Sequence, residues 1–97
     1  MRIAFTSAAA REAEEAANWY WERSGDRVRS HLLAAIEHAR GVLRDHPGMG
    51  TPGARGTRRL PLGRFPYTVI YRIDGDTVRV LAFMHQSRKP DYWRHRR

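Results

Sequence analysis

Two β-rich runs joined by an Asp-Gly pair constrain the fold of this chain more than any other feature of the sequence. The runs are FPYTVIYRI, residues 65–73, and TVRVLAFMH, residues 77–85, and Asp74-Gly75 lies between them. Glycine readily takes the positive φ that tight hairpin turns need, so Asp-Gly between such runs is a strong signal for a β-hairpin. A third β-rich run, RRLPL at residues 58–62, precedes them. The second half of the chain therefore predicts three consecutive strands.

Alternation assigns the residues of this hairpin to the two faces of a sheet. In the first strand, Thr68, Ile70 and Arg72 lie opposite a face formed by Tyr67, Val69, Tyr71 and Ile73. In the last strand, Val78, Val80, Ala82 and Met84 lie opposite a face formed by Thr77, Arg79, Leu81, Phe83 and His85. We expect one face of the sheet to pack on helices and the other to be partly open and lined with Arg.

The first half of the chain begins with a short strand and a helix. Arg2–Phe5 alternates polar and apolar residues but is too short to stand alone, so we expect it to join the sheet made by the second half. Thr6 or Ser7 can cap a helix that runs to about Arg23. This helix should end at Ser24-Gly25. Its apolar face consists of residues three and four apart, namely Ala9, Ala13, Ala16, Ala17 and Tyr20.

A second helix follows directly. Asp26 can cap it, and His46-Pro47 ends it because the residue before a proline is pushed out of helical geometry. Its apolar stripe comprises Val28, Leu32, Ala35, Ile36, Ala39, Val42 and Leu43. Helices joined by so short a link form an antiparallel hairpin. Trp19 and Trp21 point about 200° apart on the first helix, so we expect one of them in the core and the other at an edge or interface.

Together these elements predict an α+β fold with the order β-α-α-β-β-β. The helical hairpin packs on one face of a small, mostly antiparallel four-stranded sheet, and residues 1–97 form a single domain. Residues 47–57, rich in Gly and Pro, have no apolar periodicity and read as a connecting loop. The chain has no Cys, and no segment approaches the roughly 20 apolar residues of a membrane span. We expect a soluble, cytoplasmic protein with no membrane association.

The net charge of +8 is spread unevenly along the chain. Residues 1–46 contain seven Arg and seven acidic residues, whereas the rest contains ten Arg and one Lys against three acidic residues. Such asymmetry indicates a polyanionic or acidic partner for the basic half. Arginines on a sheet can hold phosphates by bidentate hydrogen bonds. The candidate target- or nucleic-acid-binding residues are Arg58, Arg59, Arg64, Arg72, Arg88, Lys89 and Arg94.

The tail MHQSRKPDYWRHRR allows two readings. It is either a solvated end or part of a site, because His85, Arg88 and Tyr92 lie within eight residues at the end of a strand. In the second reading His85 could exchange a proton in RNA cleavage, Arg88 could stabilise the phosphate, and Tyr92 could place the base or act as an acid. The remaining His residues show no metal-ligand spacing, so we expect no metal site and no cofactor.

Several segments in this order resemble the RelE/ParE superfamily of toxins from bacterial type II toxin-antitoxin systems. They include WYW at the end of the first helix, HPGMG after the second, and RRL followed by FPYTVIYR. After the hairpin, VLAFMHQSRKPDYWRHRR completes the pattern. The resemblance covers nearly the full chain and implies the same fold.

The two branches of this superfamily imply different targets. Members similar to RelE cleave mRNA on the ribosome without a metal, and Arg59, Arg88 and Tyr92 match positions of their basic and C-terminal set. Members similar to ParE poison DNA gyrase and lack that set. The position after Tyr67, commonly Arg in the nucleases, is Thr68 here. This substitution and the FPY strand favour the ParE branch, with the ribosome-dependent nuclease and a non-toxic nucleic-acid-binding module as alternatives.

Either branch implies a cognate antitoxin that is acidic, partly disordered and folds on binding to form a hetero-oligomer. We expect it to bind the groove beside the helical hairpin and the basic sheet face. The candidate antitoxin-binding residues are Arg59, Arg64, Trp19 and Trp21.

Overall fold

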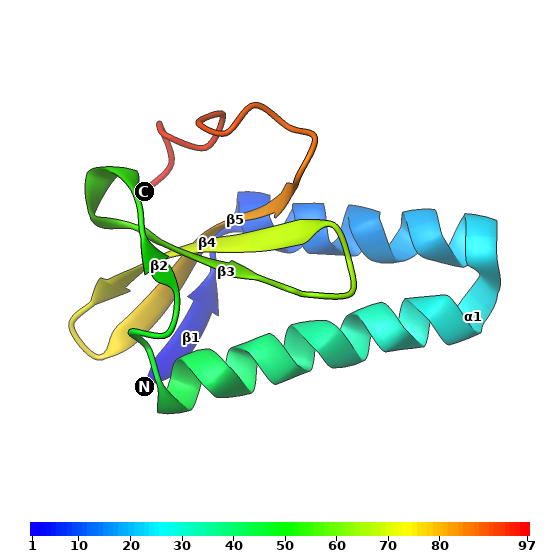
Figure 1. Ribbon diagram of the computed structural model, residues 1–97, viewed down its shortest axis with the longest axis horizontal. Helices are drawn as coiled ribbons and strands as arrows, with labels where there is room; N and C mark the ends of the chain where they lie inside the picture. Colours follow the sequence, from blue (N-terminus) through cyan, green and yellow to red (C-terminus); the bar gives the residue numbers. More distant parts are fainter.

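A five-stranded sheet in the order β1-β5-β4-β3-β2 organises the structure, a computed structural model that describes residues 1–97 (Figure 1). The strands are β1 (Arg2–Phe5), β2 (Thr51–Pro52), β3 (Arg58–Pro61), β4 (Tyr67–Asp74) and β5 (Thr77–His85). β1 pairs in parallel with β5, and all other pairs are antiparallel. The α+β class and the mostly antiparallel sheet are thus confirmed.

The predicted count of four strands is wrong, because the loop of residues 47–57 contributes a fifth. In this loop, β2 pairs with β3, with Thr51 opposite Arg59 and Pro52 opposite Arg58. Proline is tolerated there because β2 is an edge strand, where its missing N–H group is not needed by the ladder. A short 3-10 turn, η1 (Ala54–Gly56), follows it.

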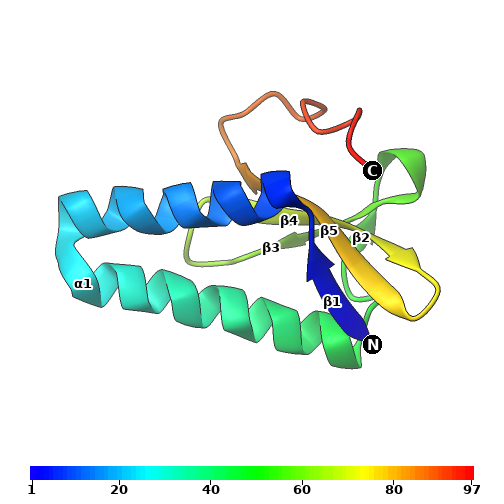
Figure 2. The ribbon, with the colours of Figure 1, turned by 180° about the vertical axis from the view of Figure 1, so that it is seen from behind.

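The helical hairpin forms as the sequence predicts. α1 (Ser7–Asp45) is interrupted at Gly25, which has φ 81° and ψ −174°, and the two arms run antiparallel on either side of it (Figure 2). The Thr6 hydroxyl caps the first arm by accepting a hydrogen bond of 3.1 Å from the Ala9 N–H. The second arm ends at Asp45, before His46-Pro47. No helix has an apolar stretch of the length that a membrane crossing requires.

One face of the sheet packs against the two arms of α1. The arms contribute the buried Ala9, Ala16, Ala17, Leu32, Ile36 and Leu43. The sheet contributes Tyr67, Val69, Tyr71, Val78, Val80 and Phe83. Ala39 is buried as well, so three of the five apolar residues predicted for the first helix and four of the seven predicted for the second are confirmed as buried.

A β-bulge in β5 changes the predicted faces of its C-terminal half. Ile70 pairs with Ala82 but its neighbour Tyr71 pairs with Val80, so Leu81 is an extra residue. An extra residue inverts the alternation that follows it. Phe83 therefore packs on the helix side and Ala82 on the other side, opposite to the sequence prediction. Met84 and His85 change faces for the same reason, which brings His85 to the helix side, beside Tyr67.

The face away from the helices is covered in part by the tail. Trp93 is 3% exposed and packs on Ile70, Leu81, Ala82 and Met84. Its indole N–H donates a hydrogen bond of 2.8 Å to the Pro90 carbonyl. The expectation that Trp19 or Trp21 lies in the core is wrong, because both are exposed on α1. The buried tryptophan is the one in the tail.

Tyr71 ties the loop after α1 to the sheet. Its side chain is fully buried, and its hydroxyl donates to the Pro47 carbonyl at 2.7 Å and accepts from the Gly50 N–H at 2.9 Å. A Cβ at Gly50 would lie 2.7 Å from that hydroxyl, so the close approach requires glycine. Arg58 reinforces the loop by donating to the Gly50 carbonyl at 2.8 Å.

The break in α1 yields a test with an internal control. Gly25 lies in a backbone region accessible almost only to glycine, so Gly25→Ala should lower the free energy of unfolding by about 1–3 kcal/mol. Gly41 lies in the interior of the second arm with room for a Cβ, so Gly41→Ala should raise it by about 0.5–1 kcal/mol. Urea denaturation measures both values. A neutral Gly25→Ala would contradict the assigned turn.

Candidate functional site

A cavity of about 460 Å³ lies where the first arm of α1, the end of β5 and the start of the tail meet. We call it the groove. From α1 it is lined by Glu12, Glu15, Ala16, Trp19 and Tyr20, and from the rest of the chain by Pro66, Tyr67, Phe83, His85, Ser87, Arg88 and Tyr92. Aromatic rings and groups of both charges therefore share one surface.

The groove brings together the three residues considered for RNA cleavage. The Arg88 guanidinium lies 4.0 Å from the centroid of the Tyr92 ring. The His85 ring meets the Tyr67 ring edge to face at 5.1 Å, and its Nδ1 accepts a hydrogen bond of 3.0 Å from the Ser87 N–H. These side chains converge because the bulge in β5 turns His85 toward α1.

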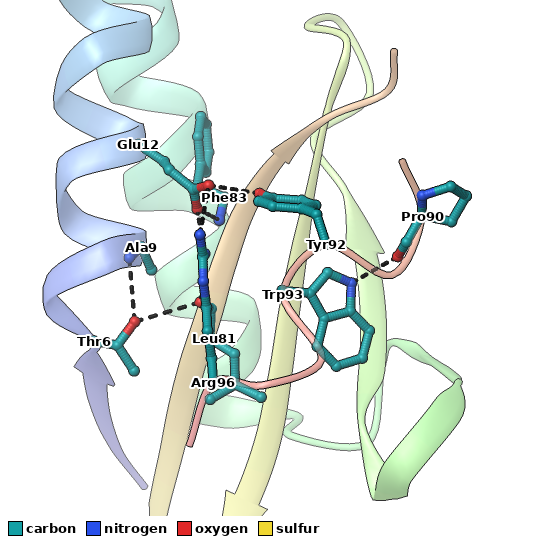
Figure 3. Close-up of polar contacts among 9 residues, drawn as sticks. All are labelled: Thr6, Ala9, Glu12, Leu81, Phe83, Pro90, Tyr92, Trp93 and Arg96. Atoms are coloured by element: carbon teal, nitrogen blue, oxygen red, sulfur yellow. Dashed lines mark hydrogen bonds and ion pairs between the residues drawn. The ribbon is translucent and has the colours of Figure 1, made fainter. Parts of the chain in front are cut away.

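Glu12 is the central polar residue at this site (Figure 3). One carboxylate oxygen, Oε1, accepts from Arg96 Nη1 at 2.8 Å and from the Phe83 N–H at 3.0 Å. The other, Oε2, accepts from the Tyr92 hydroxyl at 2.6 Å and from Arg96 Nη2 at 3.2 Å. The Glu12 side chain is only 13% exposed. This carboxylate thus joins α1, β5 and the tail.

Sequence reasoning did not identify Glu12 as a site residue. It only counted Glu12 among the seven acidic residues of residues 1–46. A signal was present, since Glu12 lies three residues after Ala9 and four before Ala16, both on the buried face of the helix. An acidic residue in such a stripe requires a buried partner. The partner, Arg96, is 84 residues away in the sequence.

The pKa values follow from these contacts. Burial alone would raise the pKa of Glu12, but the hydrogen bonds from Arg96, Tyr92 and the Phe83 N–H outweigh it and lower the pKa below its ordinary value. Burial, reinforced by the bond to Glu12, raises the pKa of Tyr92 far above its ordinary value. The hydrogen bond to Glu12 also raises the pKa of Arg96. At neutral pH Tyr92 is therefore a fixed hydrogen-bond donor.

The same contacts protect part of a sheet edge. β1 ends at Phe5, opposite Val80, so the second half of β5 has no neighbouring strand on that side. Glu12 accepts from the Phe83 N–H, and Arg96 Nη1 donates to the Leu81 carbonyl at 3.1 Å. Side chains thus stand in for a strand as far as Phe83. The remaining edge, toward His85, runs along the groove.

The predicted basic residues are divided between several places. Arg58 is engaged in the loop contact to Gly50. Arg64 lies exposed in the turn between β3 and β4, and Lys89 lies exposed in the tail. Arg72 lies on the sheet face away from the helices. Only Arg88 lines the groove.

Arg59 and Arg94 line a second cavity of about 220 Å³, which also contains Trp93. Arg59 pairs with Ile70 and so faces away from the helices, whereas Trp19 lines the groove on the helix side. Trp21 is exposed on α1 outside the groove. The residues predicted to bind an antitoxin therefore do not form one continuous surface. No cluster of three or more His, Asp and Glu side chains could hold a metal ion.

Comparison with known proteins points to one family. The family described as "ParE toxin of type II toxin-antitoxin system, parDE" matches residues 3–90. A Sinorhizobium fredii (strain NBRC 101917 / NGR234) protein named "Putative toxin Y4kP" is 35% identical over 85 residues, which are 87% of this chain and 86% of that protein. The solved structure of the chromosomal ParDE TA system from P. aeruginosa superimposes with a TM-score of 0.76, is 20% identical, and covers 88% of this chain and 95% of that chain. The last match establishes the shared fold.

Removing the Glu12 carboxylate should destabilise the chain in a pH-dependent way. Glu12→Ala leaves Arg96 and the Phe83 N–H without their acceptor, so at pH 7 we expect the free energy of unfolding to fall by about 2–3 kcal/mol. Glu15→Ala, at an exposed position on the same arm, should change it by less than about 0.5 kcal/mol. Urea denaturation of both variants and the unmodified chain measures the difference.

The sign of the pH effect follows from the lowered pKa of Glu12. A carboxylate with a lowered folded-state pKa contributes its full stabilisation above its ordinary value of about 4.5 and loses it as the pH falls through the folded-state value. The gap between the unmodified chain and Glu12→Ala should therefore narrow below about pH 4.5. A gap that stays constant into acid would refute the role of this charge.

Proposed function

The chain belongs to the ParE toxin family of type II toxin-antitoxin systems, and from this membership we propose that it inhibits growth by poisoning DNA gyrase and is neutralised by a cognate antitoxin. In this proposal it performs no chemistry and acts by binding in the cytoplasm. The observation that carries it is the engagement of Tyr92 and Arg96 with Glu12. These groups hold the tail in place, and the Tyr92 hydroxyl, engaged with Glu12, is not free to act as an acid toward a substrate.

The chemistry of the groove favours binding over cleavage. A general acid or base works best with a pKa near the working pH, whereas the pKa of Tyr92 is raised far above it. Thr68, at the position where the nucleases commonly have Arg, is 7% exposed and lies away from the groove. The charge that would hold a scissile phosphate at that position is therefore missing.

One observation keeps the RelE-like nuclease as a second candidate. His85, Arg88 and Tyr92 line the same groove, and the Arg88 guanidinium lies against the Tyr92 ring. A substrate that displaced Glu12 from Tyr92 would free these groups for RNA cleavage. The two candidates differ in their products, because a nuclease leaves cut messages and a gyrase poison leaves broken DNA.

Purified gyrase and plasmid DNA separate the two candidates. The chain should inhibit supercoiling and cause cleaved DNA to accumulate. Arg88→Ala should weaken this effect at least about tenfold, the loss expected when a charge at a desolvated interface is removed. Arg27→Ala, at an exposed position beside the tip of the helical hairpin, is the matched control and should act like the unmodified chain.

Cells that express the chain alone provide the second readout. We expect filamentous cells with DNA damage signalling and intact messages. Codon-phased mRNA cuts abolished by Arg88→Ala, together with unaffected gyrase, would overturn the proposal in favour of the nuclease.

We also propose that the antitoxin binds in the groove. The exposed Trp19 ring, the uncovered edge of β5 near His85 and the Arg88 charge offer an apolar anchor, backbone hydrogen-bond partners and a positive contact. An acidic segment that orders on binding matches all three features. Binding there would cover Tyr92 and Arg88 and form a hetero-oligomer.

Trp19 and Trp21 provide a matched test of this interface. Trp19→Ala should weaken antitoxin binding about 30-fold, the loss typical of a buried aromatic anchor, and Trp21→Ala should have little effect because it lies outside the groove. Calorimetry with the purified antitoxin measures both affinities. Charge reversal of Arg59 and Arg64, which lie outside the groove, should also weaken the complex, through lost long-range attraction between the basic chain and its acidic partner. An unchanged affinity for Trp19→Ala would place the antitoxin elsewhere.

A further inference from the structure

Five arginines gather on the side of the sheet that α1 leaves uncovered. Arg72 and Arg79 pair directly across β4 and β5, and their neighbours Tyr71 and Val80 pack on the helix side, so both arginines point to the opposite side. Arg59 lies on this side too, because it pairs with Ile70 beneath Trp93. We call this surface the basic face, and it consists of Arg55, Arg59, Arg72, Arg79 and Arg94.

Loop and tail contacts extend the basic face beyond the strands. The Arg55 carbonyl accepts a hydrogen bond of 3.5 Å from Arg72 Nη2, which places η1 beside β4. Arg94 lines the same cavity as Arg59. Figure 1 shows the C-terminus lying beside the loop that contains η1. Three separate segments thus bring arginine residues to one surface.

These charges are poorly compensated within the chain. Only Arg79 and Arg94 have carboxylate partners, Asp74 at 4.0 Å and Asp91 at 3.5 Å. Like charges directly opposite each other destabilise a sheet, as Arg72 and Arg79 do here. Arg55 also has a positive φ of 58°, which is unfavourable for a residue other than glycine. Such an arrangement does not stabilise the fold but suits an anionic ligand.

From this geometry we propose that the basic face binds the phosphate backbone of duplex DNA. Guanidinium groups bind phosphate oxygens in a bidentate manner, and a row of them neutralises successive phosphates. Proteins that bind single strands stack bases on exposed aromatic rings. The basic face offers no such ring, since Trp93 is buried and the exposed Trp19 and Trp21 lie on α1. A duplex, whose bases are already stacked, is the polyanion that fits.

The choice of duplex DNA over duplex RNA rests on the proposed function, because gyrase acts on DNA. The contact would let the toxin bind the DNA that its target holds, as well as the target. It uses a different side of the sheet from the groove, so it makes no demand on His85, Arg88 or Tyr92.

Fluorescence anisotropy with a labelled duplex DNA of about 20 base pairs tests the proposal on the isolated full chain. The logarithm of the association constant should fall with the logarithm of salt concentration with a slope of about −3.6 to −4.5, as expected for four or five phosphate contacts. The double variant Arg59→Gln/Arg72→Gln should reduce the magnitude of this slope by about 1.8 and weaken binding roughly tenfold or more.

The matched control is Arg11→Gln/Arg27→Gln, which removes the same charge from exposed positions on α1. It should leave the slope unchanged. Thermal unfolding should show that Arg59→Gln/Arg72→Gln is folded and at least as stable as the unmodified chain, because one repulsive pair is relieved.

Several results would overturn the proposal. These are absence of DNA binding at about 50 mM salt, an equal loss in the control pair, or tighter binding to single-stranded DNA or duplex RNA. Competition by inorganic phosphate at low concentration would instead indicate a site for a small anion and would also overturn it. This assay contains no gyrase. A negative result would therefore overturn DNA binding by the basic face without bearing on the proposal that the chain poisons gyrase.

Discussion

The rest of this structure depends on the hydrogen bonds that the Glu12 carboxylate accepts. It accepts hydrogen bonds from Arg96 and Tyr92 of the tail and from the Phe83 N–H of β5, so one side chain of α1 fixes two other segments. A nearly buried charge is stabilising only when its lone pairs are satisfied, and here donors surround both oxygens. The tail is consequently held in place, and the groove has a defined wall.

The second constraint is a single extra residue in β5. Leu81 shifts the register, so that Phe83 and His85 turn toward α1 while Ala82 and Met84 turn away. The bulge thereby creates a continuous apolar patch on which Trp93 packs. It also aligns the Phe83 N–H with Glu12. The shape of the groove and the packing of the tail on the sheet are therefore two consequences of the same bulge.

The parts of the fold that sequence reasoning predicted correctly have local causes. Gly25, the Thr6 cap and the Asp74-Gly75 turn act within a few residues, and each is found where the sequence places it. The features that were missed depend on distant partners or on one inserted residue. Glu12 and Arg96 are 84 residues apart, and no local pattern distinguishes a bulge at Leu81 from plain alternation. The fold class was therefore predictable, whereas the arrangement of the candidate site was not.

The tail connects the two surfaces that the sheet keeps apart. Tyr92 lines the groove, and Trp93 packs on the sheet face away from the helices. Arg94 lies beside Arg59 on the basic face. These three consecutive residues thus contact both proposed binding surfaces, and Arg96 then returns to Glu12. Displacing Tyr92 from Glu12 would remove one of the hydrogen bonds that hold this tail, whereas Arg96 holds it through bonds of its own.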